Sequence, residues 1–114
     1  MDRTRALFNG TVPIRGCEVI AVAMAPEEAF HRAFRNQEFD ITELSLSNYM
    51  NVTARGISHY AAIPVFPSRL FRHSSIYVRA DRGIERPEDL RSKLVGVPEY
   101  QMTVAVWIRG ILQD

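Results

Sequence analysis

The chain has 114 residues, 46% of them hydrophobic and 24% charged, which is the composition of an ordinary globular protein. Its net charge is +1, and acidic residues interrupt the basic ones between Arg69 and Lys93, so a surface for nucleic acid is not expected. No stretch is long and apolar enough to insert into a membrane. Cys17 is the only cysteine, which excludes an internal disulfide, and the apolar run around it predicts a buried side chain.

The first third of the chain is expected to form a helix, a strand and a second helix. The first helix is expected over residues 2–9, where Gly10 ends it. The apolar run at 17–23 predicts a strand that is covered on both faces. Pro26 then opens a helix with acidic residues in its first turn, and Phe30 lies on the inward face of that helix.

The remaining segments continue this alternation. Further strands are expected at 39–41, 60–66, 75–79 and 94–98, and further helical segments at 47–55, 87–90 and 103–112. Trp107 lies on the apolar face of the last helix, which predicts a core position. This order predicts an α/β fold with a mostly parallel sheet flanked by helices. In such a fold, polar residues that follow the strands gather where ligands bind.

The first polar cluster follows the strand expected at 39–41 and contains Glu43, Ser45 and Ser47. A loop between a strand and a helix offers hydroxyls and free backbone N–H groups to an anion. Plain capping of the next helix by Ser45 or Ser47 is the alternative. Of the three residues, Glu43 is the one that capping explains least. The charge of Glu43 would repel a carboxylate ligand unless Glu43 is a proton carrier.

The second cluster follows the strand expected at 60–66 and contains Arg69, Arg72 and His73. Arginine grips a carboxylate with a two-pronged fork, and histidine transfers protons near neutral pH. Two arginines and a histidine so close together suit an aromatic dicarboxylate. The alternative is a solvated loop with a structural histidine.

The third cluster lies between the strand expected at 94–98 and the last helix, and it contains Glu99, Tyr100 and Thr103. Thr103 is expected to cap that helix, whose first N–H groups would face a cleft. The alternative is a cap beside a surface glutamate. No spacing of His, Asp or Glu predicts a metal site, and no glycine-rich phosphate loop is present, so neither a metal nor a cofactor is expected.

Four segments carry a resemblance to a known family: FDITELSLSNYM, PSRLFRHSSIYV, RPEDLRSKLVGVPEYQMT and WIRGIL. Together they resemble the 4,5-dihydroxyphthalate decarboxylase family, over nearly the whole chain. PEDL followed by VGV is generic to a wider superfamily, whereas the other segments are more specific. The family is similar in fold to type II periplasmic binding proteins and to the solute-binding proteins of ABC transporters. The resemblance therefore implies part of a lobe of that fold.

The family is longer than this chain and has two lobes. Residues 1–114 are therefore expected to form an incomplete N-terminal lobe that lacks its first strand and the second lobe. The isolated chain is expected to be less stable than a whole lobe and to be inactive, because sites of this fold lie between two lobes. A non-functional remnant is a further alternative.

The resemblance implies decarboxylation of a 4,5-dihydroxyphthalate-like dicarboxylate to a dihydroxybenzoate, as part of a longer protein. No signal peptide is visible in the sequence, so a cytoplasmic location is expected. Arg69 and Arg72 are our choice to anchor the retained carboxylate. His73 and Glu99 are the best candidates for the base and the acid, with neither role assigned and Glu43 in reserve. The remaining substrate-binding candidates are Ser45, Ser47, Tyr100 and Thr103.

A non-catalytic solute-binding protein of an ABC transporter is the alternative function. It would be periplasmic and would bind a small anionic or aromatic ligand. The same arginines would serve such binding, and the shared fold does not separate the two functions. In either case the expected partners are a small aromatic carboxylate and the second lobe of the longer protein.

Overall fold

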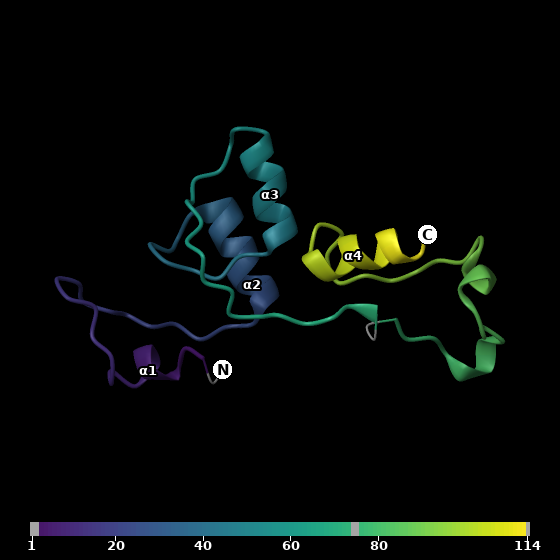
Figure 1. The fold of residues 1–114 in the computed structure, drawn as a ribbon, viewed down its shortest axis with the longest axis horizontal. Coiled ribbons are helices and arrows are strands. Elements are labelled where there is room, and N and C mark those ends of the chain that lie inside the picture. Colours follow the sequence, from purple (N-terminus) through teal and green to yellow (C-terminus); the bar gives the residue numbers. More distant parts are fainter. Residues whose placement is uncertain (1–2, 74–75, 114) are drawn as a thin grey trace. The chain divides into compact units, whose positions relative to one another are not determined.

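The computed structural model describes residues 3–73 and 76–113. Its helices are separated by long irregular segments (Figure 1). Within the described ranges the α-helices are α1 (Arg5–Phe8), α2 (Pro26–His31), α3 (Leu46–Ala54) and α4 (Thr103–Ile111). Further helical turns of other types lie at η1 (Arg32–Asn36), η3 (Ala80–Arg82) and η4 (Pro87–Leu90). None of the helices in these ranges combines the length and the apolar character needed to cross a membrane.

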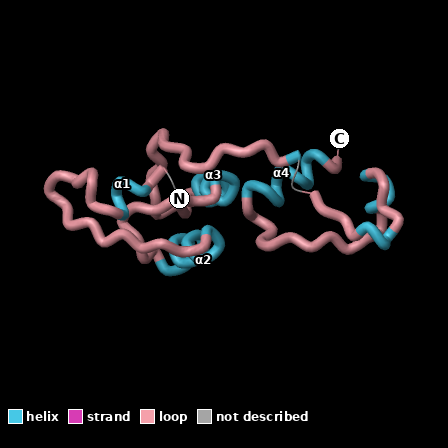
Figure 2. The backbone as a smooth tube through the Cα atoms, turned by 90° about the horizontal axis from the view of Figure 1, so that it is seen from below, coloured by secondary structure: helices cyan, strands magenta, loops and turns pink. Residues whose placement is uncertain are grey.

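The predicted α/β fold with a mostly parallel sheet is wrong, because residues 3–73 and 76–113 contain no β-strand (Figure 2). The expectation that the chain forms part of a periplasmic-binding-protein-like lobe depends on that sheet, so it is wrong for the same reason. The segments expected as strands at 17–23, 39–41, 60–66 and 94–98 are irregular, and the strand expected at 75–79 begins at Ser75, outside the described residues.

The failure of the strand prediction has a physical reason. Apolar composition predicts burial, yet Ile20 is 83% exposed, Ile63 is 66% exposed and Leu94 is fully exposed. A parallel strand is stable when neighbouring strands complete its hydrogen bonds and helices cover both of its faces. No such ladder forms around these segments in the described part of the chain. An apolar run therefore specifies a preference for burial, and the pairing that makes a strand is a separate requirement.

The chain divides into two compact units. The first unit comprises Met1–Glu43 and Tyr60–Arg69, and the second comprises Leu44–His59 and Leu70–Asp114.

In the first unit, α2 and η1 pack together. Pro26 is the first residue of α2, as the sequence predicts. The positive N-terminal end of the helix dipole interacts favourably with the acidic side chains in the first turn. Phe30 is 8% exposed and Ala33 is completely buried, so the predicted inward face forms the small core of this unit. Gln37, with φ of 56°, ends the helical segment in the left-handed conformation.

Arg32 joins the helix to the segment that follows it. Its Nε donates to Glu38 Oε2 at 2.6 Å, its Nη1 donates to Glu28 Oε1 at 3.3 Å, and its guanidinium lies 5.2 Å from the centre of the Phe39 ring. A hydrogen bond from Asn36 and the ion pair with Arg32 hold the pKa of Glu38 below its ordinary value. The polar side chains of this turn therefore stabilise the chain reversal after η1.

Cys17 is exposed, which corrects the prediction of a buried side chain. The segment that carries it is irregular, and the nearby Val19 and Ile20 are also exposed. The residues around Cys17 are apolar, but in the described part of the chain they are not buried against another segment.

In the second unit, α3 packs against α4. Gly56 follows α3 with φ of 70°, which ends the helix where the sequence predicts. In α4 the buried residue is Ala105, at 1% exposure, whereas Trp107 is 58% exposed. The predicted core position of Trp107 is therefore wrong, because the small Ala105, on a different face of α4, takes the buried position instead.

Candidate functional site

The first and third polar clusters of the sequence meet at the N-termini of α3 and α4. The Ser45 and Thr103 hydroxyl oxygens lie 3.2 Å apart, and the Ser45 and Ser47 hydroxyl oxygens lie 3.3 Å apart. Ser47 Oγ also donates to the Gln101 carbonyl at 2.6 Å. Ser45 is only 6% exposed, whereas Ser47 and Thr103 are half-buried, so this hydroxyl cluster is partly open to solvent.

The two helices cap one another. The backbone N–H of Thr103, the first residue of α4, donates to Ser45 Oγ at 3.2 Å. In return, the backbone N–H of Ser47, in the first turn of α3, donates to Thr103 Oγ1 at 3.3 Å. Neither N-cap residue, Ser45 nor Met102, uses its side chain to accept a capping hydrogen bond from a backbone N–H of its own helix. Capping was the alternative predicted for these serines, and it occurs across the helices.

Two helix N-termini at one place have an electrostatic consequence. Each helix has nine residues and carries roughly half a positive charge at its N-terminus. Part of this charge is met by the hydroxyl oxygens of Ser45 and Thr103, which are neutral. The arrangement therefore favours a negatively charged group near Ser45, Ser47 and Thr103.

Tyr100 and Glu99 lie in the loop just before α4. The Tyr100 carbonyl accepts a hydrogen bond of 2.7 Å from Arg109 Nη1, and the Arg109 guanidinium lies 3.8 Å from the centre of the Tyr100 ring. Glu99 is half-buried, and its carbonyl accepts from the Met102 N–H at 3.2 Å. Sequence reasoning missed Arg109, because a cation near the end of a helix is usually a surface residue. Its position directly beside the apolar Ile108 was the signal available.

The other predicted site residues are not gathered at this centre. Arg72 is half-buried and His73 is exposed, and no contact described for the chain joins either of them to Ser45 or Thr103.

Glu43 and Arg69 belong to the first unit. Glu43 is exposed, and its carbonyl accepts from Thr42 Oγ1 at 3.1 Å. Arg69 is exposed, with its guanidinium 5.2 Å from the centre of the Phe66 ring.

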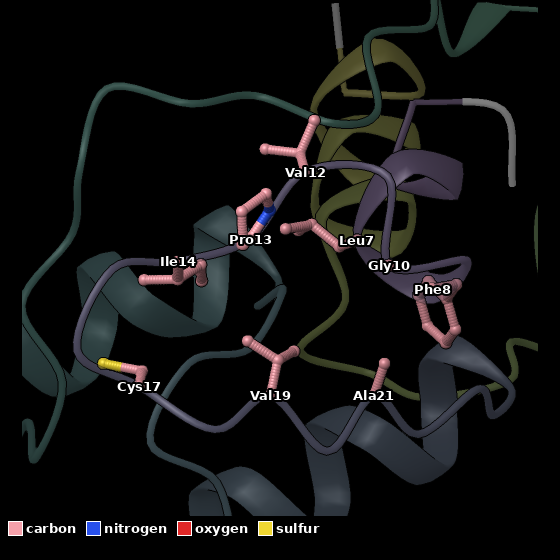
Figure 3. A pocket seen from close by; sticks show the side chains of 9 residues that line it. All are labelled: Leu7, Phe8, Gly10, Val12, Pro13, Ile14, Cys17, Val19 and Ala21. Carbon is pink, nitrogen blue, oxygen red and sulfur yellow. The ribbon is translucent and has the colours of Figure 1, made fainter.

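A groove of about 320 Å³ in the first unit contains none of the predicted site residues (Figure 3). Apart from Gly10 and Cys17, every residue that lines it has an apolar side chain: Leu7, Phe8, Val12, Pro13, Ile14, Val19 and Ala21. Across residues 3–73 and 76–113, no three His, Cys, Asp or Glu side chains gather in a way that would hold a metal ion.

Comparison with known proteins shows what the chain is similar to. It is 57% identical over 113 residues to a 4,5-dihydroxyphthalate decarboxylase of Comamonas testosteroni, which covers 99% of this chain and 34% of that protein. It is 55% identical over 112 residues to a 4,5-dihydroxyphthalate decarboxylase of Pseudomonas putida, which covers 98% of this chain and 43% of that protein. No protein-family model matches the chain.

The chain thus spans well under half the length of either relative. The alignment covers 99% of this chain and therefore includes the segments that carry Ser45, Arg72 and Thr103. The comparison confirms the resemblance that the sequence predicts: over nearly its whole length, this chain is similar to 4,5-dihydroxyphthalate decarboxylases.

Proposed function

We propose that the polypeptide that carries this chain decarboxylates 4,5-dihydroxyphthalate or a close analogue to a dihydroxybenzoate. The observation that carries the proposal is the 57% and 55% identity to two proteins with this name. Both relatives are longer than this chain, so the activity is proposed for a longer polypeptide. A cytoplasmic location is part of the same proposal. Neither relative is named as a solute-binding protein, so that alternative has no comparable support.

The reaction needs a base, an acid and an anchor for the carboxylate that remains. A base takes the proton of the ring hydroxyl para to the departing carboxylate, which moves electron density into the ring. An acid gives a proton to the ring carbon that bears this carboxylate. The bond to the carboxylate carbon then breaks, its electron pair returns to the ring, and carbon dioxide leaves.

The candidate residues divide among these tasks by their chemistry. Arg69 and Arg72 have the guanidinium forks that suit the retained carboxylate. His73 and Glu99 share the roles of base and acid, with Glu43 in reserve.

The hydroxyls at the paired helix N-termini and the nearby Tyr100 complete the proposed set. Their support is electrostatic, since Ser45, Ser47 and Thr103 lie where two helices present their positive ends. A dicarboxylate is the kind of ligand that such a place favours.

The test uses the complete polypeptide encoded by the gene that carries this sequence. It is incubated with 4,5-dihydroxyphthalate, and the release of carbon dioxide is followed. We expect turnover in the wild type and a loss of at least about a hundredfold in kcat/KM for Arg72→Ala and His73→Ala. Arg91→Ala and His59→Ala are matched controls at exposed positions, and both should keep wild-type turnover.

The outcomes separate the two functions. Turnover that survives in both the Arg72 and His73 variants would move the chemistry away from this loop. No turnover in the wild type, combined with thermal stabilisation by aromatic acids, would reject the enzyme and favour a binding protein.

A further inference from the structure

A second groove, in the second unit, has a different character from the groove of Figure 3. It measures about 380 Å³ and runs beside α4. Val95 and Val97 line it from the segment before the helix, and Ile108 and Leu112 line it from the helical side. Among the described residues that line it, Arg109 is the only charged one, and Tyr100 lies beside Arg109. The groove therefore joins an apolar floor to a single cation.

Arg109 differs from the ion-paired arginines of the chain. Arg32, Arg79 and Arg86 each pair with an acidic side chain, at 2.6 Å, 2.6 Å and 3.9 Å. Arg109 is half-buried, and in the part of the chain that the structure describes it pairs with no acidic side chain. No acidic side chain of the described residues therefore neutralises its charge, although Arg109 lies beside apolar surface. Such a charge favours an anionic partner.

Tyr100 holds the Arg109 side chain in place without using up its capacity. The ring of Tyr100 lies against the guanidinium, and the Tyr100 carbonyl takes one of its five N–H donors. A planar guanidinium that is fixed in this way is ready to bind a carboxylate through two parallel hydrogen bonds. The neighbouring Val97 and Ile108 offer the apolar contact that an aromatic ring needs.

We propose that this groove binds the ring of an aromatic carboxylate and that Arg109 pairs with its carboxylate group. The inference rests on the proposed function for the class of ligand, and it adds a substrate-binding residue that the sequence did not suggest. Arg109 is thus an alternative to Arg69 and Arg72 as the anchor of the carboxylate that is retained in the product. A cation on the departing carboxylate would stabilise the starting state more than the transition state, in which that charge is being lost.

The experiment measures binding by calorimetry with the complete polypeptide. The probes are 3,4-dihydroxybenzoate and its uncharged amide, which have the same ring and differ in the charge of one substituent. The wild type should bind the carboxylate about ten to a hundred times more tightly than the amide. Arg109→Gln should bind both probes alike, Arg109→Lys should fall between, and the exposed control Arg91→Gln should match the wild type.

Two further measurements keep the inference testable. If Arg109→Gln loses its fold, methyl resonances of Ile108 and Leu112 in the wild type report on the groove directly. The chemical shifts of these methyl groups should change when 3,4-dihydroxybenzoate is added. Unchanged chemical shifts at both residues would overturn the inference. With 4,5-dihydroxyphthalate, Arg109→Gln should raise KM about tenfold or more while kcat changes little.

Failure of this inference differs from failure of the proposed function. If the wild type turns over the substrate and Arg109→Gln has an unchanged KM, the proposed role of the groove is wrong and the proposed enzymatic function stands. No turnover in the wild type, together with carboxylate binding that Arg109→Gln removes, rejects the enzyme and supports the groove.

Discussion

At the scale of single residues, the paired hydroxyls of Ser45 and Thr103 are the feature that most constrains the second unit. They lie 58 residues apart in the chain, and each accepts a hydrogen bond from the other's helix. A hydroxyl at the start of a helix is a local signal, so the sequence predicted both positions. Which helix each hydroxyl caps depends on the approach of α3 to α4, which is not a local property.

This exchange of caps predicts coupling between Ser45 and Thr103. Ser45→Ala and Thr103→Val should each lower the free energy of unfolding of the complete polypeptide by about 0.5–2 kcal/mol, the usual cost of a lost cap. The double variant should lose less than the sum, because both side chains belong to one hydrogen-bond network. Urea denaturation of the four proteins measures the difference.

Thr53→Val serves as the control for this cycle, since Thr53 is exposed at the other end of α3. It should be nearly neutral and should add to either variant. Strict additivity of Ser45→Ala and Thr103→Val would contradict the mutual capping.

At the scale of elements, two glycines have opposite roles, although a side chain added at either one would clash with nothing. A Cβ at Gly56 or at Gly110 would find no atom within 4 Å. Gly56 has φ of 70° and ends α3, whereas Gly110 lies within α4. Side-chain space is therefore equal at the two sites, and only the backbone conformation differs.

The two alanine substitutions should change stability in opposite directions. Gly56→Ala forces an L-residue into the left-handed region and should cost about 1 kcal/mol. Gly110→Ala gains helix propensity and should stabilise by up to about 1 kcal/mol. Thermal unfolding of the complete polypeptide checks both, and a gain in stability from Gly56→Ala would contradict the described end of α3.

At the scale of the whole molecule, burial is sparse. Among the described residues, the buried apolar residues are Phe30, Ala33 and Ala105, and many large apolar side chains are exposed. Hydrophobic burial is the main favourable contribution to folding, and little of it is made here. The relatives are longer, so additional chain is available in them to cover such surfaces.

We expect the 114 residues alone to unfold without a sharp transition, to bind a dye specific for exposed apolar surface, and to release no carbon dioxide from 4,5-dihydroxyphthalate. The complete polypeptide should unfold cooperatively. Hydrogen exchange on the isolated chain should show its strongest protection in α3 and α4, where the caps are exchanged. Turnover by the 114 residues, or a sharp two-state transition, would contradict this expectation.

Local sequence signals were sufficient to locate several helix ends. Pro26 opens α2, Gly56 ends α3, and η4 forms where Asp89 accepts hydrogen bonds from the backbone N–H groups of Glu85 and Arg86. These are signals within a few residues of the structure that they specify. The sequence also determined the resemblance to 4,5-dihydroxyphthalate decarboxylases, which comparison confirms.

Which segments found packing partners depended on contacts between distant parts of the chain. Leu94, Ile20 and Cys17 are exposed because burial and strand pairing require contacts from distant parts of a chain, and those contacts are not encoded in a local apolar pattern. For the same reason, the sequence identified Ser45 and Thr103 separately, and their meeting at two helix N-termini emerged from the packing of α3 on α4.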